Sequence, residues 1–98
     1  MNIVVKTILY LQTMIYSYHV RLARSALNLT QSELAEKSGV SAPTIKTIEQ
    51  SEPYKELKNS RVIIMALERF FTDSGLIFID EEEFIGVKIG KKIIKEMK

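Results

Sequence analysis

The chain has 98 residues, 46% of them hydrophobic, which is enough for one domain with a modest hydrophobic core. Its formal net charge of +2 does not by itself indicate nucleic-acid binding, so a basic surface would require local clustering of basic side chains. The candidates for such a surface are Arg21, Lys37, Lys46, Lys55 and Lys58. The absence of cysteine excludes a disulfide framework, a thiolate zinc site and a cysteine nucleophile, and it agrees with a reducing compartment.

The N-terminal segment, residues 1–17, is rich in Ile, Val, Leu, Met and Tyr. Lys6 and Gln12 interrupt it, whereas a membrane span needs about 20 predominantly apolar residues. No small-residue cleavage site follows, so we expect an apolar extension that either lengthens the first helix or packs against a partner. Alternatively, Met14 is the natural start, and residues 1–13 are upstream sequence with no evolved role.

A short helix is predicted to begin after Thr30. The Thr30 side chain can accept a hydrogen bond from a free backbone amide, and Glu33 can reach back to complete a capping box. Leu34 and the small Ala35 supply the inner face of this helix. Gly39 can adopt the left-handed backbone that ends a helix, so we expect the helix to end at about residue 38.

A second short helix is predicted over residues 42–50. Ser41 can cap its N-terminus, and Pro43 lies in its first turn, where a missing amide proton costs little. The i, i+3, i+4 spacing places three side chains on the inner face: Ile45, Ile48 and Glu49. The opposite face is polar and consists of Pro43, Lys46, Thr47 and Gln50.

Glu49 stands out because a carboxylate on an inner face is costly unless it is paired. Arg24, on the helix expected before Thr30, is the candidate partner. We therefore predict an Arg24–Glu49 ion pair that ties the first helix to the second helix of the pair.

Two capped helices joined by a glycine turn have the spacing of a DNA-binding helix-turn-helix. The chain resembles the Cro/C1-type (XRE) regulators of bacteria and phages at Val20, Arg24, Leu27, Leu29, Thr30, Gln31, Leu34, Ala35, Gly39, Val40, Ser41, Ile45, Ile48 and Glu49. The resemblance implies a mainly α fold, a lambda-repressor-like helical DNA-binding domain over residues 18–74. It covers about a third of the chain tightly.

The same resemblance implies a sequence-specific transcriptional regulator that binds double-stranded DNA as a homodimer, and we expect it to act as a repressor. We also expect a cytoplasmic protein that needs no cofactor and no metal. By resemblance, the second helix of the pair enters the major groove and Gln31 contacts the DNA backbone. The expected DNA-contacting residues are Gln31, Ser41, Ala42, Pro43, Thr44, Lys46, Thr47 and Gln50. Ala42 and Pro43 depart from the long polar residues found in relatives, which leaves apolar contact with a thymine methyl at that end.

Residues 51–59 are predicted to form a loop, either a solvated one or one whose Lys55, Lys58 and Asn59 touch phosphate. Ser60 is expected to cap a helix that ends at about residue 73. Its predicted core stripe consists of Ile63, Ala66, Leu67 and Phe70.

The C-terminal segment, residues 75–98, is predicted to contain a short β-hairpin and a basic tail. Gly75 ends the preceding helix, and two apolar runs at residues 76–79 and 84–89 flank an acidic turn. The hairpin either pairs edge to edge with a second copy or covers its own core. The tail, residues 90–98, is expected to be a frayed helix, with a phosphate-contacting arm as the alternative.

The sequence contains few residues in arrangements that could carry out catalysis, so we do not expect an enzyme. His19 is the single histidine and has no motif-linked nucleophile or metal partner, so a surface or half-buried structural role is expected. The acidic turn lacks the spaced ligands of a calcium loop. Two rival functions stay open: an antitoxin that masks a toxin and autoregulates its operon, and a helix-turn-helix used only as a protein-docking scaffold.

Overall fold

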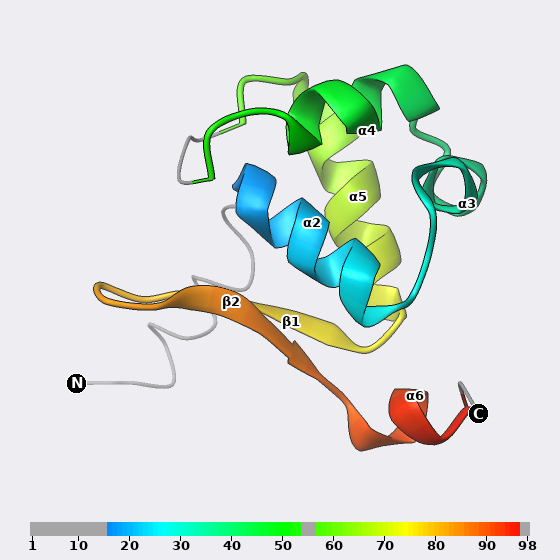
Figure 1. Ribbon diagram of the computed structural model, residues 1–98, viewed down its shortest axis with the longest axis vertical. Coiled ribbons are helices and arrows are strands. Elements are labelled where there is room, and N and C mark those ends of the chain that lie inside the picture. Colours follow the sequence, from blue (N-terminus) through cyan, green and yellow to red (C-terminus); the bar gives the residue numbers. More distant parts are fainter. Residues whose placement is uncertain (1–15, 54–56, 97–98) are drawn as a thin grey trace.

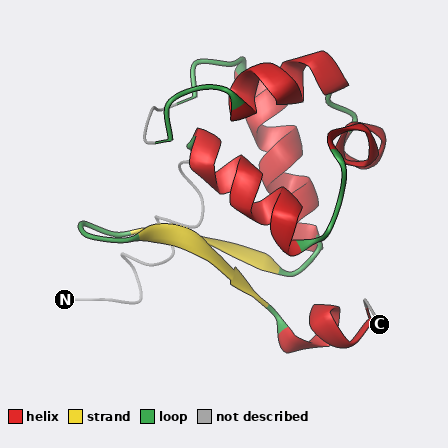
Figure 2. Cartoon of the chain, viewed as in Figure 1, coloured by secondary structure: helices red, strands yellow, loops and turns green. Residues whose placement is uncertain are grey.

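The computed structural model describes residues 16–53 and 57–96, so nearly all of the expected N-terminal extension, and Lys55, lie outside the described residues. The elements are α2 (Ser17–Ala26), α3 (Gln31–Ser38), α4 (Ala42–Glu49), α5 (Arg61–Asp73), β1 (Leu76–Asp80), β2 (Ile85–Ile89) and α6 (Lys91–Glu96). Helices α2 to α5 form one cluster, the hairpin crosses below α2, and α6 lies apart from the cluster (Figure 1). The chain is thus mainly helical with a C-terminal hairpin, as predicted (Figure 2).

The predicted helix caps are present. Thr30 Oγ1 accepts from the backbone N–H of Glu33 at 3.0 Å, and Glu33 Oε1 accepts from the N–H of Thr30 at 2.8 Å. This hydrogen bonding with Thr30 lowers the pKa of the exposed Glu33. Gly39 has a φ of +81°, which ends α3 in the left-handed conformation. Ser41 and Ser60 cap α4 and α5, and α4 ends at Glu49 with Gln50 as its C-cap.

The hydrophobic core lies between the helices α2 to α5 and extends to the inner face of the hairpin. It consists of Val20, Ala23, Leu34, Val40, Ile45, Ile48, Leu67, Phe71, Leu76 and Phe78. The predicted stripe on α5 was only partly right, because Leu67 is fully buried while Ile63, Ala66 and Phe70 are half-buried. Phe71 is the fully buried aromatic residue of this helix.

The reason for this difference is that α5 packs against β1 as well as against α3. The ring of Phe71 meets the ring of Phe78 edge to face, with centroids 5.9 Å apart. The hairpin therefore widens the buried face of α5 toward Phe71.

The hairpin is antiparallel, and its register runs from Leu76 opposite Ile89 to Asp80 opposite Ile85. The first strand is one residue longer than predicted and the second starts one residue later. Leu76 and Phe78 are buried, so the inner face of the hairpin covers the core of its own domain. Whether its edge also pairs with a second copy stays a prediction.

His19 is fully buried, more deeply than expected, because the hairpin covers α2. Its Nε2 lies 2.7 Å from the carbonyl oxygen of Ile79, and its Nδ1 accepts from the backbone N–H of Tyr16 at 3.0 Å. These two bonds fix a neutral ring that donates through Nε2. Burial lowers the pKa of His19, although the bond to Ile79 and the charge of Asp80 act in the opposite direction. His19 thus ties α2 to the hairpin.

Candidate nucleic-acid interface

Helix α4 presents one buried and one exposed face. Ile45, Ile48 and Glu49 are buried, and the exposed side chains are Pro43, Lys46, Thr47 and Gln50. The helix lies at the end of the molecule opposite the hairpin (Figure 1). Its polar face is therefore free to meet a large ligand without disturbing the core.

Arg24 and Glu49 hold α4 against α2. Arg24 Nε donates to Glu49 Oε2 at 2.7 Å, and Arg24 Nη2 donates to Glu49 Oε1 at 2.8 Å, which makes the pair bidentate. The third guanidinium nitrogen, Nη1, donates to the carbonyl oxygen of Leu29 at 2.8 Å. The bonds to Glu49 raise the pKa of Arg24 further above its usual range. Through its bond to Leu29, Arg24 also holds the turn that precedes α3.

Gln31 belongs to the same polar cluster, a contact that was not predicted from the sequence. Its side-chain Nε2 donates to Glu49 Oε1 at 3.2 Å. Gln31, the first residue of α3, and Arg24 of α2 thus both donate to one carboxylate oxygen of Glu49, the last residue of α4. A glutamine amide has a second N–H and a carbonyl oxygen, so Gln31 retains groups that can bind a ligand at the N-terminus of α3.

The two threonines of α4 use their hydroxyl groups within the protein. Thr47 Oγ1 donates to the carbonyl oxygen of Pro43 at 3.0 Å, and Thr44 Oγ1 lies 2.8 Å from Ser41 Oγ. Since a hydroxyl has one proton, Thr47 has none left to donate to a base. It can offer a base its methyl group or a lone pair.

The remaining residues predicted to bind DNA lie around the start of α4. Ser41 is exposed and caps the helix by accepting from the N–H of Thr44 at 3.3 Å, and Ala42 is half-buried. Lys46 is the basic residue of α4, and Arg21, Lys37 and Lys58 are exposed on other segments. The structure brings Gln31 next to the C-terminal end of α4, but the contact of any of these side chains with DNA stays a prediction.

A family model described as helix-turn-helix matches residues 20–67. The match begins in α2, ends in α5 and includes both α3 and α4 with the turn between them. The chain carries a Cro/C1-type helix-turn-helix domain of the XRE family. XRE domains belong to DNA-binding transcription regulators rather than to enzymes, and the chain is a regulator of this type. No curated protein is similar enough in sequence to count as a relative of this XRE chain.

Two further features concern the residues that the structure describes. None of the helices within residues 16–53 and 57–96 has the length and apolar character needed to cross a membrane. Across the same ranges, no group of three or more His, Asp or Glu side chains is placed to hold a metal ion, and the acidic turn that follows β1 is exposed.

Proposed function

We propose that this XRE protein is a repressor that binds operator DNA as a homodimer and blocks transcription by occupying a promoter. The observation that carries the proposal is the exposed polar face of α4, held in place by the ion pair between the buried Glu49 and the half-buried Arg24. Two such helices, set about 34 Å apart in a dimer, would meet successive major grooves of a roughly palindromic site.

The residues of this surface divide by the group that they contact on DNA. Gln31 and the backbone amides at the helix N-termini bind phosphates and set the register. Thr44, Lys46 and Thr47 meet base edges, with Lys46 donating to a guanine and the threonine methyls packing against thymine. Ser41, Ala42, Pro43 and Gln50 line the same contact.

Binding to the DNA upstream of its own gene tests this function. The protein is titrated with that DNA and with random duplex at several salt concentrations, because counterion release is common to both DNAs while base readout is not. We expect a preference of about a thousandfold for the upstream DNA. Equal weak binding to both DNAs would argue against an autoregulating repressor.

A pair of lysine variants locates the contact. Lys46→Ala should lower the preference for the specific site, whereas Lys88→Ala, which removes the same charge from the exposed side of β2, should not. A reporter gene behind the upstream DNA then separates repression from activation, because a repressor lowers its expression.

The hairpin favours a second candidate function, that of an antitoxin. Ile77 and Phe84 are 42% and 67% exposed, which suits a protein partner on this side of the molecule. A small toxin-like gene in the same operon, whose growth arrest is relieved by this chain but not by its Phe84→Ser variant, would support this candidate.

A further inference from the structure

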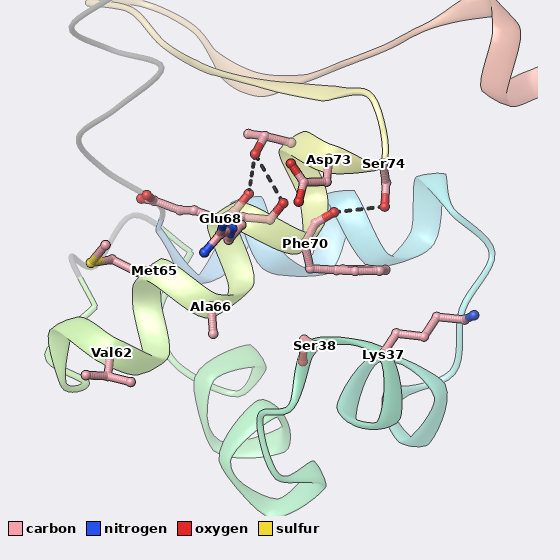
Figure 3. Close-up of a pocket in the computed structure, with 11 residues that line it drawn as sticks. Lys37, Ser38, Val62, Met65, Ala66, Glu68, Phe70, Asp73 and Ser74 are labelled. Carbon is pink, nitrogen blue, oxygen red and sulfur yellow. Dashed lines mark hydrogen bonds between the residues drawn. The ribbon is translucent and has the colours of Figure 1, made fainter.

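Helix α5 has an outer face that no described part of the chain covers. Val62 is 77% exposed and Met65 is 55% exposed, although both are large apolar residues. With the exposed Arg69 they form an i, i+3, i+7 stripe along one side of the helix. Figure 3 shows Val62 and Met65 near the N-terminal end of α5, among the residues that line a groove beside this helix.

A groove continues this face toward α3. It has a volume of about 960 Å³ and lies between α5 and the C-terminal end of α3. Ala66 and Phe70 of α5 line it on one side, and Lys37 and Ser38 of α3 line it on the other (Figure 3). Val62, Met65 and Arg69 also line this groove, so the stripe and the groove form one uncovered surface.

The charges at the ends of α5 are opposite to those that a lone helix favours. The macrodipole favours acidic residues at the N-terminus and basic residues at the C-terminus. Helix α5 instead begins with Arg61 and ends with Asp73, with no acidic residue in its first turn and no basic residue in its last. Within the described part of the chain neither Arg61 nor Asp73 forms an ion pair, and Arg61 has only a longer-range charge interaction with Glu68 of its own helix.

We propose that the outer face of α5 binds the same face of a second copy of the chain, with the two helices antiparallel across a two-fold axis. In this arrangement Arg61 of each copy lies beside Asp73 of the other, which pairs the two unfavourable charges. Val62 and Met65 then pack against the C-terminal half of the opposite helix, including the aliphatic part of Arg69. The exposed face of α4 takes no part in this contact. The inference rests on the proposed homodimeric function and names its interface.

The hairpin is the competing surface for a second copy. Its residues Leu76 and Phe78 are already buried in their own core, and the exposed Ile77 lies opposite the exposed Lys88. A lysine beside an apolar side chain on the uncovered face of a strand pair opposes pairing with a copy of itself. The charge pattern and exposure therefore favour α5.

A charge exchange on the full chain tests the interface. Arg61→Glu and Asp73→Arg each place like charges together across the two-fold axis, whereas the double variant restores opposite charges with the sign reversed. Each substitution also replaces an unfavourable helix-end charge with a favourable one, so it should not unfold the monomer. Circular dichroism checks that each variant is folded.

The readout is the dimer dissociation constant, measured by sedimentation equilibrium without DNA at roughly 1 to 100 μM protein. We expect each single charge variant and Met65→Glu to raise the dimer dissociation constant at least about tenfold. The double variant should restore the wild-type dissociation constant, and Ile77→Glu should leave it unchanged. A monomeric wild-type chain over this range, or a dimer weakened by Ile77→Glu but not by Met65→Glu, would overturn the interface.

The same proteins separate failure of the interface from failure of the proposed function. A dimer that responds to the α5 variants but does not prefer the upstream DNA supports the interface and contradicts the repressor. If the chain binds DNA specifically and none of the four α5 variants changes its oligomeric state, the repressor is supported and the interface is contradicted.

Discussion

Gln31 and Arg24 donate hydrogen bonds to the same oxygen of Glu49, at 3.2 Å and 2.8 Å. One carboxylate therefore connects α2, the first residue of α3 and the last residue of α4. Because Gln31 is the residue proposed to contact the DNA backbone, the cluster that stabilises the fold also orients the side chain for which this contact is proposed. We therefore expect stability and DNA binding to be coupled at this position.

The first prediction concerns this carboxylate. Glu49→Gln leaves the Arg24 guanidinium partly buried without its counter-charge, so it should lower the free energy of unfolding by about 2–3 kcal/mol. Urea denaturation followed by circular dichroism measures the change. The control is Glu36→Gln, on the exposed side of α3, which should change stability by less than about 0.5 kcal/mol. Equal effects of the two substitutions would contradict the role of Glu49.

The second prediction separates the methyl group of Thr47 from its hydroxyl group. The hydroxyl proton is bound to the carbonyl oxygen of Pro43, so a base is offered the methyl group. Thr47→Ser should weaken specific DNA binding about fivefold, or by about 0.8–1 kcal/mol, while Thr47→Val should keep most of the affinity. Fluorescence anisotropy with the upstream DNA gives both values. The reverse order would show that the hydroxyl oxygen is the group that contacts the base.

The third prediction is a pH dependence caused by His19. Burial lowers the pKa of His19 in the folded state, so the unfolded chain binds a proton at higher pH than the folded chain does. The neutral ring stabilises the fold above the unfolded pKa of about 6.5, and this stabilisation declines as the pH falls below that value. Unfolding free energies measured between pH 7.5 and about pH 5 should show the decline.

A variant isolates the histidine contribution. His19→Gln keeps an amide donor that can reach Ile79 but does not titrate, so its stability should change less over this pH range. Glu68 acts in the opposite direction, because burial raises its pKa and the folded chain gains stability as Glu68 is protonated. If the wild type and His19→Gln have the same pH profile, His19 is not the cause.

The fourth prediction compares neighbouring phenylalanines on α5. Phe71 is fully buried and contacts Phe78, whereas Phe70 is half-buried. Phe71→Leu should therefore lower the unfolding free energy by about 1–2 kcal/mol, and Phe70→Leu by clearly less. Thermal and urea denaturation provide the comparison. A larger effect at Phe70 would mean that the sequence stripe describes the core better than the structure does.

The elements specified by local chemistry could be predicted from the sequence. Thr30, Gly39 and Ser41 act on the backbone of their immediate neighbours, so their capping roles do not depend on the rest of the fold. The Arg24–Glu49 contact could be inferred because a carboxylate on the inner face of a helix needs a partner.

The features that depend on packing between distant elements could not be predicted. Periodicity along α5 does not indicate that the hairpin covers Phe71. His19 is buried by the same hairpin, and its hydrogen-bond partner Ile79 lies 60 residues away in the chain. The contact of Gln31 with Glu49 likewise depends on how the ends of α3 and α4 meet in space. Many helices have a polar side chain at their ends, so the positions of Gln31 and Glu49 in the sequence do not indicate this contact.

The enclosed position of His19 also makes it a natural spectroscopic reporter. As the single histidine, it gives ring resonances in a proton NMR spectrum that need no isotope label and no assignment against other histidines. Its Nε2 proton is shielded from water by the hairpin and should exchange slowly while the hairpin is docked. If the addition of DNA or of a protein partner shifts these resonances, the side of the molecule opposite α4 responds to binding.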